Sequence, residues 1–183
     1  MQELSMNILD IAENSVKAGA LLILVLLEYT DDKRLILTIE DNGKGMDEET
    51  VKKVSNPFYT SRTTRKVGLG IPFIKMAAEM TGGSFMIESK VGAGTNVKAE
   101  FFYEHIDMMP LGNIGETLSA LISTNETIDF RYSVKCNGNE FVLDTKEIKD
   151  LLGGVSLNNA EVAVFIRDYT NEHTEEVLIG LKH

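Results

Sequence analysis

Asp41-Asn-Gly-Lys-Gly-Met46 is the most informative stretch of the sequence, and it directly follows Leu35–Glu40, a predicted strand. An ionised Asp only accepts hydrogen bonds, so at the mouth of a pocket it suits the exocyclic amine of a base. Glycines such as Gly43 and Gly45 let the backbone approach a flat ring closely. Asp-Asn-Gly is also a common turn sequence, and a plain turn is therefore the alternative interpretation.

Upstream of this stretch, a stripe of Leu4, Ile8, Ile11 and Ser15 at helical spacing and a glycine at position 19 predict a helix over Leu4–Lys17. Asp10, Asn14 and Lys17 share its opposite face, at positions i, i+4 and i+7. An Asn carbonyl is a hard oxygen ligand suited to Mg²⁺, a Lys can meet phosphate, and a carboxylate can hold a hydroxyl. The alternative is an ordinary solvated helix face.

Two glycine-containing segments follow downstream. Lys66-Val-Gly-Leu-Gly-Ile71 leads into a helix predicted from about Gly70 to Met80, which would direct free N–H groups at phosphates. Gly92-Ala-Gly-Thr95 precedes a strand, where Thr95 can donate its hydroxyl inward. Each segment alone is common, and a glycine hairpin is the alternative for the second.

In this order, the four segments resemble the N, G1, G2 and G3 boxes of the GHKL or Bergerat-fold superfamily, which joins histidine kinases, gyrase, Hsp90 and MutL. Asn56-Pro-Phe-Tyr-Thr60 resembles the F box of histidine kinases. The resemblance covers about residues 4–103. It implies an α+β fold, a two-layer α/β sandwich whose mostly antiparallel sheet has helices on one face, and ATP with Mg²⁺ as the ligand.

The resemblance also implies roles for single residues. Asn14 would coordinate Mg²⁺, Lys17 would contact phosphate, and Asp41 would bind the adenine amine in a pocket shaped by Gly45 and Thr95. Asp10 occupies the position of a general base, where Glu is more usual. The implied nucleotide contacts are Asn14, Lys17, Asp41, Gly43, Gly45, Met46, Phe58, Thr60, Arg62, Lys66, Gly68, Leu69, Gly70 and Thr95. Residues 59–66 would be the ATP lid, with a solvated basic loop as the alternative.

Charge divides the chain into two parts. Residues 1–103 hold 12 Lys and Arg against 14 Asp and Glu, whereas residues 104–183 hold 6 against 14. We therefore predict an ATP-binding domain over residues 1–103, a linker over 104–110 and a small acidic α+β module over 111–183 that binds a protein partner or mediates self-association. The alternative is that the acidic part completes the core of the first domain.

The acidic part shows its own pattern of elements. It predicts a helix near Gly112–Ile122, a hairpin from Thr127 to Leu143 turning at Asn137-Gly138, and a helix near Thr145–Leu152. Val162, Phe165, Ile166 and Tyr169 predict a final amphipathic helix. Its negative charge argues against nucleic acid as a partner, because phosphate binding needs clustered Lys and Arg.

Composition favours a cytoplasmic protein. The single Cys136 allows no internal disulfide. The longest apolar run, Ala18–Leu27, is shorter than the roughly 20 residues of a membrane span, and Leu21–Leu27 is predicted to be a buried strand. The first residues lack the pattern of a signal peptide.

Three functions remain open from the sequence: a protein kinase in signal transduction acting in trans, an ATP-gated binding module, and a slow ATP hydrolase. We expect no phosphoacceptor domain, because none of His105, His173 and His183 has the sequence setting of an acceptor. Pro72 stands where a kinase usually has Ser. Residues 60–72 resemble small ATP-binding proteins found near iron-hydrogenase subunits, which suggests such a partner.

Overall fold

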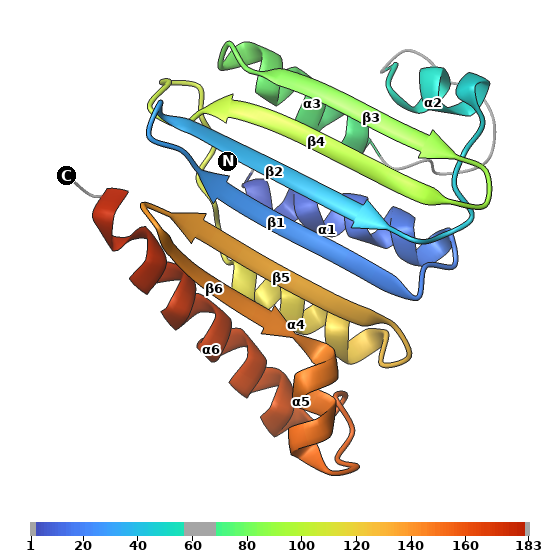
Figure 1. Ribbon diagram of the computed structural model, residues 1–183, viewed down its shortest axis with the longest axis vertical. Helices are drawn as coiled ribbons and strands as arrows, with labels where there is room; N and C mark the ends of the chain where they lie inside the picture. The colour runs from blue at the N-terminus through green and yellow to red at the C-terminus, as the bar shows by residue number, and fades with distance from the viewer. Residues whose placement is uncertain (1–2, 57–68, 182–183) are drawn as a thin grey trace.

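The computed structural model describes residues 3–56 and 69–181. These form a six-stranded sheet with the order β3-β4-β2-β1-β5-β6 (Figure 1). Neighbouring strands are antiparallel, except that β1 and β5 are parallel. The strands are β1 (Leu22–Tyr29), β2 (Arg34–Asp41), β3 (Ser84–Lys90), β4 (Gly94–Phe102), β5 (Asp129–Cys136) and β6 (Asn139–Asp144).

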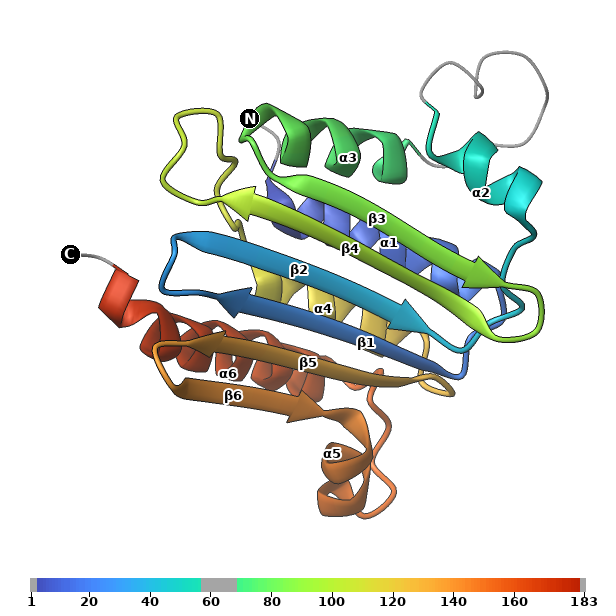
Figure 2. The same ribbon diagram turned by 45° about the horizontal axis from the view of Figure 1, so that its top comes forward.

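The long helices cover one face of this sheet (Figure 2). The helix α1 presents the predicted stripe of Leu4, Ile8, Ile11 and Ser15 to the core, and all four are buried. The predicted two-layer α+β fold is confirmed. None of the helices within residues 3–56 and 69–181 is long and apolar enough to span a membrane. The helices are α1 (Leu4–Lys17), α2 (Glu48–Val54), α3 (Gly70–Met80), α4 (Ile114–Thr124), α5 (Thr145–Leu152) and α6 (Ala160–Leu178).

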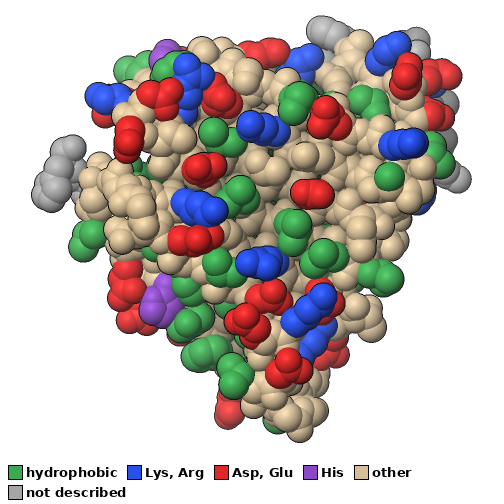
Figure 3. Space-filling view, viewed as in Figure 1, with side chains coloured by type: hydrophobic (Ala, Val, Ile, Leu, Met, Phe, Trp, Pro, Cys, Tyr) green, Lys and Arg blue, Asp and Glu red, His purple; other side chains and the backbone are tan. Residues whose placement is uncertain are grey.

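The other face of the sheet is open to solvent, and acidic, basic and apolar side chains are interspersed over it (Figure 3). Along β1, Ile23, Val25 and Leu27 point to the helices and are buried, while the alternate leucines between them are only half-buried. The prediction of a buried strand over Leu21–Leu27 is therefore correct for one face only, and Leu21 itself is 67 % exposed before the strand begins.

The acidic half of the chain extends the same sheet. β5 pairs with β1 along its whole length, from Leu22 opposite Asp129 to Tyr29 opposite Cys136. The segment before α4 is also bound to α1, because the N–H of Leu4 donates to the carbonyl of Pro110 (2.9 Å). The predicted linker over residues 104–110 lies in the connection between β4 and α4. Independent folding of residues 1–103 stays a prediction.

The last helix differs from its predicted pattern. Val162 and Ile166 of α6 are buried, as an amphipathic helix requires, but Phe165 is 55 % exposed and Tyr169 is 36 % exposed. These two rings lie on the flank of α6 beside β6, where Tyr169 contacts the ring of Phe141. The helix therefore leaves an aromatic flank only partly covered.

Candidate functional site

A cavity of about 250 Å³ lies between α1, the end of β2, α2 and the start of α3. Its walls include six of the residues that the sequence predicted: Asn14, Lys17, Asp41, Gly45, Met46 and Thr95. Within the described residues, every residue of the wall comes from positions 11–97. The structure thus brings together the helix face, the Asp-Asn-Gly segment and the last glycine segment, although they lie far apart in sequence.

Asp41 is the fixed polar group of this cavity. It ends β2, is buried, and accepts a hydrogen bond of 2.6 Å at Oδ2 from the hydroxyl of Ser15 on α1. Its Oδ1 accepts from the backbone N–H of Gly43 at 2.8 Å. A carboxylate oxygen has two lone pairs, so both oxygens can still accept from a ligand in the cavity.

Glycines allow the backbone to close around this carboxylate. Gly45 has φ +67° and Gly94 has φ +90°, a region that favours glycine. A Cβ at Gly45 would overlap the carbonyl oxygen of Lys90, and one at Gly94 would overlap that of Asp41. Gly45 and Gly94 are therefore needed because the backbone segments approach each other closely at the end of the cavity that contains Asp41.

Ser89 on β3 links the segments that surround the cavity. Its hydroxyl accepts from the N–H of Met46 at 2.8 Å and donates to the carbonyl of Gly94 at 2.9 Å. It also lies 2.9 Å from the hydroxyl of Thr95. Because a serine has one proton to donate, donation to Gly94 leaves Thr95 as the donor to Ser89. Donation by Thr95 to a ligand in the cavity, which the sequence predicted, would require this pair to reverse its direction, and it stays a prediction.

The polar face of α1 lies at the other end of the cavity. Asn14 lines the cavity, as does Lys17, whose ammonium lies 3.6 Å from a carboxylate oxygen of Glu13. Asp10 lies one turn earlier, against Gly70 at the start of α3, where an added Cβ would approach Asp10 Cβ to 2.7 Å. Partial burial, and secondly the charge of Glu13, raise the pKa of Asp10 above its usual range, while Lys17 lowers it. A raised pKa is typical of a carboxylate that accepts a proton.

Several predicted residues do not line the cavity. The N–H of Gly43 donates to Asp41, but Gly43 itself is not part of the wall. Asp10 and Gly70 lie against each other outside the wall. Leu69 is exposed and also lies outside it. Others lie outside the described residues, together with the predicted lid: Phe58, Thr60, Arg62, Lys66 and Gly68.

The sequence interpretation missed the apolar walls of the cavity and one polar group. Ile39, Ile71 and Val97 supply apolar surface, which suits a heteroaromatic ring. The helical spacing of Ser15 placed it in the core stripe of α1. Nothing in the sequence around Ser15 indicated its hydrogen bond to Asp41. The remaining unpredicted wall residues are Ile11, Ala18, Lys44, Thr50 and Val54.

The donor set fits a Mg²⁺ ion that arrives with a phosphate ligand. Among residues 3–56 and 69–181, no group of three or more His, Cys, Asp or Glu residues could hold a metal ion by itself. Mg²⁺ usually keeps several waters and uses one or two protein ligands together with substrate phosphates. The amide oxygen of Asn14, which lines the cavity near Lys17, matches that mode of binding.

The comparison with protein families identifies the class of this chain. The pattern of the histidine kinase-, DNA gyrase B- and HSP90-like ATPase family matches residues 1–105, more than half of the chain. The chain therefore belongs to this family, and its N-terminal part is an ATP-binding domain like that of histidine kinases.

Curated relatives include kinases of Bacillus subtilis. The chain is 41% identical over 66 residues to sporulation kinase D, which is 36% of this chain and 13% of the relative. It is 35% identical over 81 residues to the sensor histidine kinase YvrG, 42% of this chain and 14% of the relative. A match to YxdK, another sensor histidine kinase, covers 50% of this chain and 30% of the relative at 30% identity. The chain thus spans less than a third of each.

Solved structures share the fold at low identity. The Aquifex aeolicus MutL ATPase domain, complexed with ADP, matches with a TM-score of 0.51 and 15% identity over 84% of this chain and 70% of that chain. The N-terminal domain of a DNA repair protein matches with a TM-score of 0.57 and 12% identity, over 79% of this chain and 53% of that chain. Both matches cover more of the chain than residues 1–105 alone.

Proposed function

We propose that the chain binds ATP·Mg²⁺ in the cavity around Asp41 and transfers the γ-phosphoryl group to a separate protein in signal transduction. The observation that carries the nucleotide part is the carboxylate of Asp41, held by Ser15 and Gly43 at the edge of an apolar cavity. This acceptor lines a space whose walls are largely apolar, so it suits the amine of adenine.

The polar face of α1 supports the phosphate end of the proposal. In this arrangement Asn14 would hold Mg²⁺, and Lys17 would exchange its contact with Glu13 for one with phosphate. Mg²⁺ would supply neutralisation of phosphate charge when it is bound. The remaining contribution of the protein is to position the reacting groups, which is the main requirement of phosphoryl transfer.

Asp10 is the group that we assign to proton transfer. A Ser or Thr hydroxyl of the partner would form the new bond to the γ-phosphorus, the bond to the β-phosphate oxygen would break, and ADP would leave. Asp10 would take the hydroxyl proton, and its raised pKa favours that role. A histidine acceptor would not need this base. The resemblance to kinases of B. subtilis supports phosphoryl transfer over simple hydrolysis and does not choose between a hydroxyl and a histidine acceptor.

Incubation of the purified chain with γ-labelled ATP and a cytoplasmic extract tests the reaction. The proposal predicts label on a second protein, and Asp10→Asn should remove it if the acceptor is Ser or Thr. Asp107→Asn, which changes an exposed carboxylate in the connection after β4, serves as the control. Release of free phosphate without labelled protein would favour a hydrolase, and ATP binding without either product would favour an ATP-gated binding module.

A further inference from the structure

We propose that the outer edge of β6 and an aromatic stripe on α6 form a docking surface for a basic protein segment that binds as an added β-strand. The aromatic stripe consists of Phe165, Tyr169 and His173. The docking surface lies on elements that contribute nothing to the wall of the Asp41 cavity. The proposal therefore does not depend on the nucleotide chemistry.

The edge of β6 offers unpaired backbone groups. β6 is the last strand of the sheet, and within the described residues no strand pairs with its outer side (Figure 1). Asn137 (φ 49°) and Gly138 (φ 80°) form a two-residue turn, so the residues that flank it make a hydrogen-bonded pair and the pairs alternate from there. The N–H and C=O groups of Glu140 and Val142 therefore point away from β5, as an incoming strand requires.

The aromatic stripe continues the inner face of β6 beyond the edge of the sheet. Phe141 of β6 packs against Tyr169 (5.4 Å between ring centroids) and His173 (5.0 Å). Phe165 stacks on Tyr169 at 5.2 Å. Alternate residues of a strand added beside β6 would lie over this stripe and cover Phe165 and Tyr169, residues that are now 55 % and 36 % exposed. The stripe therefore provides the apolar floor that an added strand needs.

The negative charge around the docking surface favours a basic partner segment over a second copy of the chain. Residues 139–178 contain nine Asp and Glu residues against three Lys and Arg residues. A second copy of the chain paired through β6 would bring Glu140 and Asp144 of the two copies close together on the open face, which is unfavourable. A partner strand with Lys or Arg on that face and apolar residues on the other would complement both the edge and the stripe.

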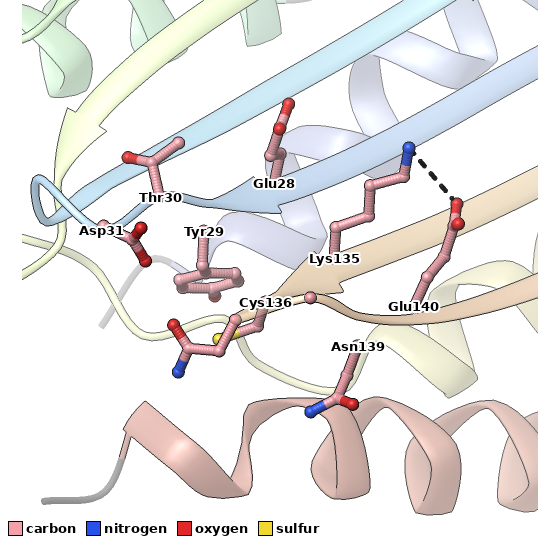
Figure 4. Close-up of a pocket in the computed structure, with 10 residues that line it drawn as sticks. Glu28, Tyr29, Thr30, Asp31, Lys135, Cys136, Asn139 and Glu140 are labelled. Carbon is pink, nitrogen blue, oxygen red and sulfur yellow. Dashed lines mark ion pairs between the residues drawn. The ribbon is translucent and has the colours of Figure 1, made fainter.

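A cavity near the turn end of β6 adds negative charge to the open face of the sheet beside this edge, because Glu28 of β1 and Asp31 in the turn after β1 line it, with β5 between β1 and β6. It has a volume of about 660 Å³ and lies between the end of β1 and the β5–β6 turn (Figure 4). Lys135 lies 3.4 Å from Glu140 there, and within the described part of the chain neither Glu28 nor Asp31 has a salt-bridge partner. The excess of carboxylates favours a cationic side chain of the partner at this end.

Binding of synthetic peptides to the full chain, without nucleotide, tests the proposal. The probe is a labelled, capped seven-residue peptide of alternating Lys and Val, followed by fluorescence anisotropy. Matched probes replace Lys by Glu, or N-methylate the amides of one edge without changing the charge. We expect the Lys–Val peptide to bind, and both matched peptides to bind at least about tenfold more weakly, because each removes one element of recognition.

Variants on the protein side separate strand pairing from charge. Val142→Pro removes an N–H that points away from β5, a position where an edge strand tolerates proline, and Val142→Thr is its matched control. Tyr169→Ala removes part of the stripe, and Ile106→Ala removes an apolar side chain that is 94 % exposed in the connection after β4. We expect Val142→Pro and Tyr169→Ala to weaken the peptide at least about fivefold and the two controls to bind as wild type does.

Three results would overturn the proposal. One is the absence of binding of the Lys–Val peptide at millimolar concentration. Another is that the N-methylated peptide binds as tightly as the Lys–Val peptide, or that Val142→Pro and Tyr169→Ala bind the Lys–Val peptide as tightly as wild type does. Either result would leave only non-specific charge attraction. The third is a dimer in sedimentation that Val142→Pro dissociates, which would assign the edge to a second copy. Should Val142→Pro fail to fold, Tyr169→Ala and the N-methylated peptide still decide the outcome.

Discussion

The hydroxyl of Ser15 donates a hydrogen bond of 2.6 Å to Oδ2 of Asp41. This buried bond joins α1 to the end of β2 across the floor of the candidate nucleotide cavity. Together with the bond from the N–H of Gly43, it orients the carboxylate before any ligand enters. A group that is already oriented loses little conformational freedom on binding, so its contribution to affinity is larger.

Replacement of Ser15 tests this orientation. We expect Ser15→Ala to weaken ATP binding by about 2- to 12-fold, the equivalent of one net hydrogen bond of about 0.5–1.5 kcal/mol. Ser5→Ala is the matched control, because Ser5 is buried in the same helix but does not line the cavity. Titration calorimetry measures both. Equal weakening by the two variants would mean that the effect comes from the helix and not from Asp41.

Removal of the Ser89 hydroxyl should destabilise the glycine-rich end of the cavity. Ser89→Ala leaves the N–H of Met46 without the acceptor that it now has at 2.8 Å. This N–H is only partly buried, so the loss of its acceptor should cost about 1 kcal/mol, the lower end of the range for an unsatisfied donor, and the melting temperature should fall by about 2–4 °C. Ser84→Ala changes an exposed position of the same strand and is the control. A melting temperature unchanged by Ser89→Ala would show that this bond network contributes little.

The raised pKa of Asp10 makes a prediction about stability and pH. The folded-state pKa lies above the usual value, so the ionised carboxylate disfavours the folded state, and stability is lost as pH rises through the folded-state pKa. Asp10→Asn should therefore melt higher than wild type at neutral pH, and this gain should vanish below about pH 3.9, the usual pKa of Asp. A gain that stays constant down to acid pH would contradict this origin.

Asp32→Asn is a control for which the expected change in melting temperature has the opposite sign to that of Asp10→Asn. A hydrogen bond from the hydroxyl of Thr30, followed by the charge of Arg34, lowers the pKa of Asp32. Ionised Asp32 therefore favours the folded state above its usual pKa, and this contribution is lost as pH falls through the lowered value. Asp32→Asn should melt lower than wild type at neutral pH, with a difference that disappears in acid.

The role of Asp10 in turnover is a separate prediction. If Asp10 accepts the proton of a Ser or Thr acceptor, Asp10→Asn should slow phosphoryl transfer by about 10²–10⁴-fold and leave nucleotide affinity nearly unchanged. Transfer rates measured with saturating labelled ATP, alongside calorimetric affinity, separate the two effects. Transfer at the wild-type rate would make Asp10 an ordinary residue of the helix face.

Local patterns predicted most of the elements. The bounds of α1 agree with the structure, because its apolar spacing and the glycine after it are both strong signals. Asp47 caps α2 through a bond of 2.7 Å from the N–H of Thr50, the bond that an Asp at this position of a helix typically accepts. The Asn137-Gly138 turn was equally clear, since both residues adopt the positive φ that this dipeptide favours.

Relationships between distant segments were not predictable in the same way. Nothing in the local sequence indicates that β5 pairs in parallel with β1, because a parallel pair requires a long connection and leaves no turn signal. The bond between Ser15 and Asp41 was missed for the same reason, since the two residues lie 26 positions apart. Phe165 and Tyr169 are exposed because the sheet ends at β6 and no further strand covers them. The spacing of apolar residues along α6 cannot show where the sheet ends.

Titration calorimetry of ATP·Mg²⁺ and GTP·Mg²⁺ into wild type and Asp41→Asn decides whether the carboxylate of Asp41 binds adenine. Wild type should prefer ATP, and Asp41→Asn should lose about 10- to 150-fold in ATP affinity, because a hydrogen bond to a charged group is worth about 1.5–3 kcal/mol. The affinity for GTP, whose base lacks the exocyclic amine that adenine would offer to Asp41, should change far less. Equal ATP affinity in the two proteins would contradict the assignment of Asp41 and of the cavity around it.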